Sequence, residues 1–248
     1  MYENHKPLKI NIISDIHYYS KKTGVTGKAF EKENAKTPND LYNCEEILTA
    51  LMDQLAKDEP EFVLVSGDVT TKAEVEAHEG VIELLRSLKA RGKKVYVITA
   101  THNYHDGDIT RRFEGDEVVT VPAVKREELY DMYREFGPDE AISVHRESMS
   151  YVVQLCDGYR LFALNDDSNR KNGSGFSEEC FEWITEQIKD AHENGQFIIP
   201  MTHHPMLSPS PFYKVIGGGN IMKDPDKRID QFTELGVNYM FTDRKSVV

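Results

Sequence analysis

Short apolar runs alternate with helical patterns along the first hundred residues. The runs Leu8–Ser14, Phe62–Val65 and Val95–Thr99 are predicted to be strands buried on both faces. Between them, Glu45–Lys57 and Lys72–Ala90 repeat apolar residues at the period of a helix. Strands that alternate with helices in this order predict a parallel sheet with crossover helices.

The rest of the chain shows a similar mixture of patterns. We expect residues 18–42 to be a long loop with little structure of its own, residues 106–122 to be a mixed loop, and residues 206–225 to be a mobile loop. The predicted helices are Arg126–Phe136, a helix capped by Ser177 that runs to about His192, and Pro225–Leu235. The predicted strands are Met149–Leu155, Tyr159–Leu164, Phe197–Met201 and Val237–Thr242, and Asp157-Gly158 marks a hairpin between the first two.

Polar residues follow four of these strands at the point where each strand ends. They are Asp15 and His17, then Asp68, then His102, and last His203 and His204. Catalytic groups of parallel sheets lie at the carboxyl ends of the strands, so we expect these side chains to meet. Residues two apart on an extended chain point the same way, which would aim Asp15 and His17 at one point. Carboxylate and imidazole together suit a divalent transition metal.

Composition limits the classes of protein that remain. The formal net charge is −12, so strong nucleic-acid binding is not expected. No apolar run approaches the length of a membrane span, and no signal peptide is visible. We therefore expect a cytoplasmic protein, or an exported one if the N-terminus is incomplete. The three cysteines are not spaced for a zinc ribbon or a disulfide framework. The oligomeric state is left open.

The order Asp-x-His, Gly-Asp, x-x-His and His-His-Pro resembles the calcineurin-like metallophosphoesterases. The resemblance implies an α/β fold, a layered sandwich of two mixed β-sheets flanked by helices, as a single domain over residues 1–242. It also implies a dinuclear site for two divalent ions, which can be Mn, Fe or Zn. Asp15 and His17 would bind the first ion, Asp68 would bridge both, and His203 would bind the second, with His204 behind it. His102 would assist the leaving group.

Two motifs depart from the family pattern. The family usually has Gly-Asn-His, whereas this chain has Ala100-Thr101-His102, so Thr101 stands at the place of a metal-ligating Asn. The Thr hydroxyl is a poorer ligand, and Asn103 or water can fill in. The family's final Gly-His-x-His is absent after Thr242, and we expect the chain to be a truncated member whose residues 243–248 are a non-native tail.

Other polar residues near these motifs have two interpretations. Arg111 and Arg112 can contact a phosphate or can be solvated surface charges. The segment Asn165–Asn169 can line the cleft or form a plain turn. His105 and Asp106 are taken as polar loop residues.

The resemblance implies a metal-dependent hydrolase, a phosphatase or phosphodiesterase, acting on a small phosphorylated substrate. A metal-bridging hydroxide would attack phosphorus in line. An alternative is a catalytically crippled relative that acts as a binding protein, since Thr101 and the lost last motif both weaken the site. The truncated chain itself can be inactive. A third alternative is a phosphotransferase with an aspartyl-phosphate at Asp15, but such sites place a second Asp where His17 stands.

Overall fold

A computed structural model describes residues 6–104, 107–167, 174–208 and 221–243. The chain forms two compact units. One unit comprises residues 9–96 and 101–133, and we call it the N-terminal unit. The other comprises residues 1–8, 97–100 and 134–248, and we call it the C-terminal unit. That the two together make one domain over residues 1–242 stays a prediction.

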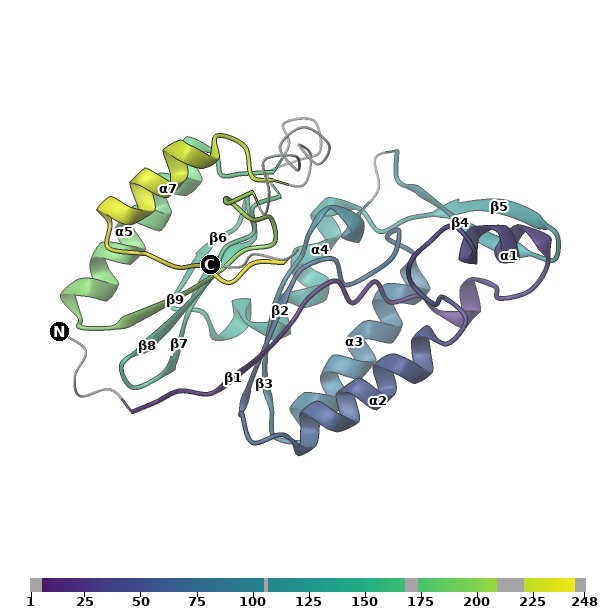
Figure 1. The fold of residues 1–248 in the computed structure, drawn as a ribbon, viewed down its shortest axis with the longest axis horizontal. Helices are drawn as coiled ribbons and strands as arrows, with labels where there is room; N and C mark the ends of the chain where they lie inside the picture. Colours follow the sequence, from purple (N-terminus) through teal and green to yellow (C-terminus); the bar gives the residue numbers. More distant parts are fainter. Residues whose placement is uncertain (1–5, 105–106, 168–173, 209–220, 244–248) are drawn as a thin grey trace. The chain divides into compact units, whose positions relative to one another are not determined.

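The N-terminal unit carries the predicted β-α-β-α-β order (Figure 1). Its elements are β1 (Ile10–Ile13), η1 (Lys21–Thr23), α1 (Lys28–Asn34), α2 (Cys44–Lys57), β2 (Phe62–Ser66), α3 (Val75–Ala90), β3 (Lys94–Ile98, whose last two residues are assigned to the other unit), η2 (Thr101–Asn103), β4 (Ile109–Glu114), β5 (Glu117–Pro122) and α4 (Arg126–Tyr133). The strands β1, β2 and β3 form a sheet in that order, and β1 runs parallel to β2. The predicted parallel arrangement of the first two strands is thus confirmed.

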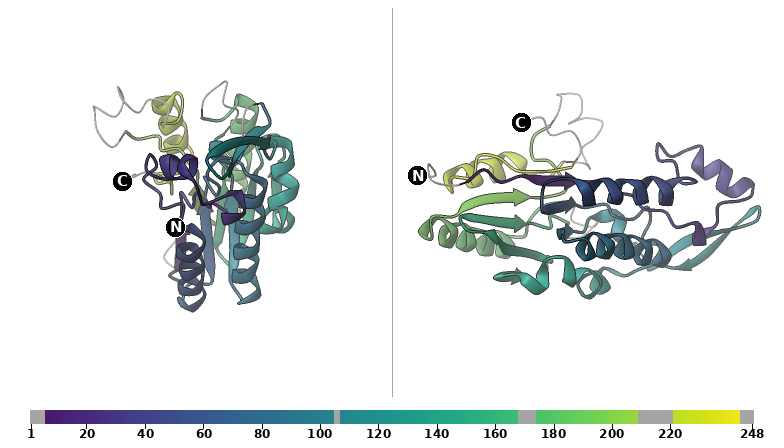
Figure 2. Two further views of the ribbon diagram at one scale, coloured as in Figure 1. Left: turned by 90° about the vertical axis from the view of Figure 1, so that its right-hand side faces the viewer. Right: turned by 90° about the horizontal axis from the view of Figure 1, so that it is seen from below.

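Helices α2 and α3 lie side by side along this sheet, as both views show (Figures 1 and 2). Each buries one apolar stripe, with Leu48, Met52 and Leu55 on α2 and Val81, Leu85 and Leu88 among those on α3. This spacing of three and four residues is the one that predicted both helices from the sequence. All five residues of β2 are buried, as expected of a strand covered on both faces. The same expectation is wrong for β1, which has no buried residue and whose Ile12 is 37% exposed, because β1 lies at the edge of this sheet.

Two segments that were predicted to lack regular structure contain it. In the described part of the predicted loop 106–122, Ile109–Pro122 form the antiparallel hairpin of β4 and β5, which turns at Gly115. Residues 18–42 contain η1 and the helix α1. The two segments stabilise each other, because the ring of Phe30 on α1 packs against Phe113 on β4 at 5.7 Å. Both predictions were wrong because the contact between Phe30 and Phe113 joins residues about 80 positions apart, and local sequence patterns do not report such contacts.

The C-terminal unit contains a sheet of its own together with the helices α5 and α7 (Figure 1). Its elements are η3 (Arg134–Phe136), η4 (Pro138–Glu140), β6 (Ser143–His145), β7 (Ser150–Cys156), β8 (Tyr159–Ala163), α5 (Glu178–Glu193), β9 (Phe197–Met201) and α7 (Pro225–Glu234). The sheet has the order β6-β7-β8-β9, with β9 parallel to β8 and the other pairs antiparallel. The mixed sheet and the hairpin at Asp157-Gly158 are as predicted.

Helix α5 covers this sheet through a core that includes Phe162, Ile184 and Ile198. The Ser177 hydroxyl accepts a hydrogen bond from the Cys180 amide and caps the helix, as predicted. The predicted strand Val237–Thr242 is wrong in extent, because only an isolated parallel bridge between Met201 and Phe241 forms there. None of the helices in the described part of the chain has the length and apolar character needed to span a bilayer.

Candidate metal centre

The loops that follow β1 and β2 bring three predicted metal ligands together. One ligand atom each of Asp15, His17 and Asp68 lies within 4.8 Å of the others. The His17 Nε2 atom is 3.3 Å from Asp15 Oδ1 and 3.9 Å from Asp68 Oδ2. Two carboxylates and an imidazole at this spacing form a donor set suited to a divalent transition ion.

The backbone explains how the three side chains meet. Strand β1 ends at Ile13, and Asp15, His17 and Asp68 all have positive φ angles, of 49°, 42° and 48°. Few residues other than glycine adopt this conformation, because Cβ crowds the backbone. The expectation that strand alternation aligns Asp15 with His17 was therefore wrong in its reason, although the two side chains do converge.

Hydrogen bonds between the two loops hold this strained backbone in place. The His17 amide donates to the Asp68 carbonyl at 2.9 Å, and the Tyr18 amide donates to the Val69 carbonyl at 2.9 Å. The Thr71 hydroxyl closes the pair by donating to the His17 carbonyl at 2.8 Å. The ladder of β1 and β2 thus continues past the strand ends and carries the ligands with it.

His102 joins the same group from the turn η2. Its amide contacts Asp68 Oδ1 at 3.2 Å, and its Nε2 lies 3.9 Å from Asp68 Oδ2. Its Nδ1 is 2.9 Å from the Thr71 carbonyl, which can only accept, so Nδ1 carries the proton. In the neutral ring Nε2 is then the basic nitrogen. The His102 side chain is 38% exposed, so this nitrogen can reach a substrate.

The charges around His17 favour a cation. Burial lowers the pKa of His17, but the hydrogen bond to Asp15 and the negative charges of Asp68 and Asp15 outweigh it and leave the pKa raised. The side chain of Asp68 is almost fully buried. The buried Asp68 carboxylate and the partly exposed Asp15 carboxylate, which stabilise a positive imidazole, would also stabilise a metal ion in its place.

The remaining residues of the third motif, Thr101 and Asn103, belong to the turn η2. Thr101 begins η2, and Asn103 ends it as a buried residue. The Asn103 carbonyl is 2.9 Å from Nε2 of His78, whose Nδ1 is 2.7 Å from the Tyr133 hydroxyl. His78 therefore supports the turn that carries His102. Metal ligation by Thr101 and the role of Asn103 beside the site stay predictions.

Arg111 and Arg112 both lie on β4, where each has a carboxylate partner. The Arg111 guanidinium is 2.7 Å from Glu33, and Arg112 pairs with Glu76. Contact of either arginine with a phosphate at the metal centre stays a prediction. His105, Asp106, Ser168 and Asn169 lie outside the described residues, as does most of the predicted loop 206–225.

The C-terminal unit positions the other two predicted site residues after β9. His203 and His204 pack edge to face, with ring centroids 4.7 Å apart. The His204 amide donates to Asp166 Oδ2 at 2.8 Å, and the His204 Nδ1 atom lies 3.2 Å from the same oxygen. His203 has Asp243 beside it, since the Asp243 amide donates to the His203 carbonyl at 3.0 Å.

Asp166 is a structural partner whose role the sequence did not reveal. The signal was the run Asn165-Asp166-Asp167, which begins two residues after the end of β8 and was interpreted as either cleft or turn. Asp166 is fully buried, so its carboxylate requires partners such as His204. The convergence of His203 with the ligands of the N-terminal unit stays a prediction.

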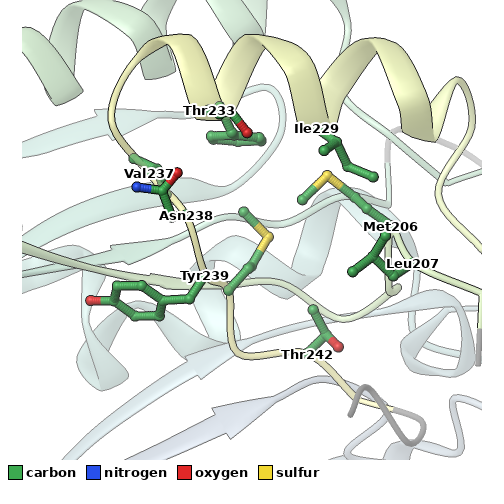
Figure 3. A pocket seen from close by; sticks show the side chains of 10 residues that line it. Met206, Leu207, Ile229, Thr233, Val237, Asn238, Tyr239 and Thr242 are labelled. Carbon is green, nitrogen blue, oxygen red and sulfur yellow. The ribbon is translucent and has the colours of Figure 1, made fainter. Parts of the chain in front are cut away.

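The C-terminal unit has a small apolar pocket, and some of its lining residues are close in sequence to His203 and His204. It has a volume of about 140 Å³ and is lined by side chains of α7, of the segment that follows it, and by Met206 and Leu207 (Figure 3). Met206 is three residues beyond His203, and Thr242 adjoins Asp243. Among the described residues, no lysine, arginine or histidine lines the pocket, so the part of it that the structure describes does not suit a phosphoryl group.

The sheets, their flanking helices and this group of ligands define an α/β protein with a candidate metal centre. A family model for calcineurin-like phosphoesterases matches residues 8–241, so the chain belongs to that family. Among solved structures, it is similar to a dimetal phosphatase from Danio rerio with a TM-score of 0.56 and 10% sequence identity. That match covers 92% of this chain and 77% of the other, and at this identity it shows the fold alone. No curated protein matches the chain. The resemblance and the fold class drawn from the sequence are confirmed.

Proposed function

We propose that the protein hydrolyses phosphoesters at a metal centre built on Asp15, His17 and Asp68. The observation that carries the proposal is the convergence of these three ligands, together with His102 beside Asp68. Divalent ions bound there would lower the pKa of water to supply an attacking hydroxide and would offset negative charge on the phosphoryl oxygens. The match to the phosphoesterase family supports the same reaction class.

The chain's own residues would act as follows. Asp68 lies between His17 and His102 and would bridge two ions, and His203 would complete the second ion's ligands. The Thr71 carbonyl accepts a hydrogen bond from Nδ1 and so orients His102. In the protonated ring, Nε2–H would face the phosphoryl group and would pass its proton to the leaving oxygen, which leaves a neutral ring with its proton on Nδ1. Mn, Fe and Zn all suit this mixture of carboxylates and imidazoles. The substrate would be a small phosphorylated molecule.

The experiment is hydrolysis of 4-nitrophenyl phosphate and of bis(4-nitrophenyl) phosphate with Mn²⁺, Fe²⁺ or Zn²⁺. The first ester reports a monoesterase and the second a diesterase. We expect His102→Ala to lower kcat by about 10²- to 10⁴-fold with metal binding retained. Asp68→Asn should lose both metal affinity and activity. Asp53→Asn and His145→Ala, which change the same residue types away from these ligands, serve as controls.

One observation favours a different function, a binding protein without catalysis. Thr101 stands where the family usually has a metal-ligating Asn, which weakens one ligand of the second ion. Metal binding that depends on Asp68 but is accompanied by no hydrolysis of either ester would favour this alternative. Failure to bind any divalent ion would contradict the hydrolase.

A further inference from the structure

A basic pocket lies on the N-terminal unit between α1 and the β4–β5 hairpin. Figures 1 and 2 show α1 alongside this hairpin, at the end of the unit. The pocket has a volume of about 430 Å³, which is in the range of small-molecule sites. Its charged lining consists of Lys28, Lys32, Lys36, Arg111, Glu33 and Asp116. None of these residues is a predicted metal ligand.

The lining has an excess of positive charge. Four of its side chains are cationic and two are anionic, although the whole chain has a net charge of −12. Lys28 pairs with Asp116 at 3.8 Å, and Arg111 pairs with Glu33 at 2.7 Å. Lys32 on α1 and Lys36 in the turn after this helix are both exposed, and neither forms an ion pair within the described part of the chain. Their charges are available to an anion.

Arg111 adds directed hydrogen-bond donors to this charge. Its guanidinium lies over the Phe113 ring at 5.3 Å, and its side chain is only 18% exposed. Its Nε is buried and has no hydrogen-bond acceptor among the described residues. A buried donor left without an acceptor is destabilising, so an oxyanion or water that reaches this nitrogen is stabilising. The planar guanidinium suits the oxygens of a phosphate.

The carboxylate in the pocket does not neutralise this arginine completely. Burial raises the pKa of Glu33, but Arg111, Lys72 and Lys36 outweigh it and leave the pKa lowered. Glu33 is thus ionised and holds the guanidinium in place through one edge. The guanidinium presents further N–H groups, because it has five donors in all.

The walls of the pocket are built in advance of any ligand. A Cβ at Gly24 or Gly27 would overlap the carbonyl oxygens of Phe113 and Gly115, so this segment packs directly on the hairpin. The Lys28 amide also donates to Asp116 Oδ1 at 2.9 Å. A preformed site does not lose affinity to ordering of its walls.

We propose that this basic pocket binds a phosphate-bearing anion with at least two negative charges. The source is either a free phosphorylated molecule or a lipid headgroup, which present the same oxygens. Binding requires neither the metal centre nor hydrolysis. It can therefore be tested apart from the proposed function.

The test is calorimetric titration of the chelator-treated full chain with inorganic pyrophosphate at low salt. A parallel arm measures sedimentation with phosphatidylcholine vesicles that contain phosphatidic acid. The double variant Lys32→Glu/Lys36→Glu should weaken binding by at least about tenfold, which is about 1.4 kcal/mol. Lys57→Glu/Lys189→Glu makes the same charge change on exposed residues elsewhere and should weaken binding by less than about threefold. Arg111→Lys keeps the charge and the Glu33 partner but loses the Nε donor, and should also weaken binding.

Each outcome decides the proposal. Pyrophosphate binding that is lost only in the pocket variant assigns a free anion, and vesicle binding with the same pattern assigns a headgroup. No binding in either arm overturns the proposal, as does equal weakening in the two double variants. Thermal unfolding of each variant checks that it is folded.

Discussion

Three predicted metal ligands occupy a backbone conformation that is unfavourable for their residue types. Asp15, His17 and Asp68 have φ angles between 42° and 49°. Such strain costs on the order of 1–3 kcal/mol per residue and persists where the surrounding structure enforces it. Hydrogen bonds between the loops after β1 and β2 enforce it here. Strain at this place is consistent with a functional role for all three side chains.

The strain at Asp15 predicts an order of stability between two variants. Asp15→Gly and Asp15→Ala both remove the ligand, but only glycine relieves the backbone. We expect the glycine variant to have the higher free energy of unfolding, by about 1 kcal/mol, in urea titrations. Metal affinity should fall in both. Equal stability of the two variants would contradict the role of the positive φ angle.

Thr101 offers a test of the family's missing ligand. Because an amide oxygen is a better metal ligand than a neutral hydroxyl, Thr101→Asn should raise affinity for the second ion by about tenfold. Metal titration followed by calorimetry measures this, with Thr49→Asn on α2 as the control. Unchanged or weaker affinity would show that Thr101 does not stand at a ligand position.

At the scale of elements, the arm made of η1, α1, β4 and β5 depends on close backbone approach. Gly24 has a φ of +102° and no space for a side chain, because its segment lies against Phe113. Gly92 has a φ of +87°, but nothing lies within 4 Å of a Cβ placed there. A substitution at Gly92 therefore tests backbone strain alone, whereas a substitution at Gly24 tests backbone strain together with close packing.

The glycine pair predicts two different losses of stability. Gly92→Ala should cost about 1–2 kcal/mol for the left-handed backbone alone. Gly24→Ala should cost about 1–3 kcal/mol more, because the added methyl group displaces the hairpin. Urea unfolding measures both, and hydrogen exchange of α1 locates the second loss. A Gly24→Ala variant as stable as Gly92→Ala would refute the close approach.

At the scale of the whole molecule, the predicted site residues are shared between two units. The N-terminal unit holds Asp15, His17, Asp68 and His102, and the C-terminal unit holds His203 and His204. Within each unit, buried polar groups support these residues. His78 is fully buried in α3, and burial lowers its pKa to about 4. A buried neutral histidine makes stability depend on pH.

The sign of this dependence follows from the two pKa values of His78. Between the folded value of about 4 and the ordinary 6.5, the unfolded chain binds more protons. Stability should therefore fall as pH drops from 6.5 toward 4, by on the order of 3 kcal/mol from this group. In the His78→Gln variant, the slope of the free energy of unfolding against pH between 4 and 6.5, measured by urea titration, should be smaller by the equivalent of one bound proton. This holds whatever the stability of the variant at pH 7. The same slope in wild type and variant would contradict the assignment.

Where the chain's own pattern was strong, the elements were predicted closely. Strand β9 has the bounds expected for it, and α2 differs by one residue. The hairpin of β4 and β5 was missed, although Gly115-Asp116 between residues of high strand propensity was a usable signal. Helix α1 had no comparable signal, because a seven-residue helix is stabilised mainly by the contact of Phe30 with Phe113.

By itself, the sequence determined the family, the order of strands and helices, and the identities of the candidate ligands. These depend on residue type and on local periodicity, which act over a few positions along the chain. Only the tertiary structure decided how Asp15, His17 and Asp68 meet. Their positive φ angles and the hydrogen bonds between the two loops cannot be predicted from the alternation of side chains along a strand. It also decided that three lysines of the expected loop gather around Arg111 in a basic pocket. Those contacts form only when distant segments pack against each other.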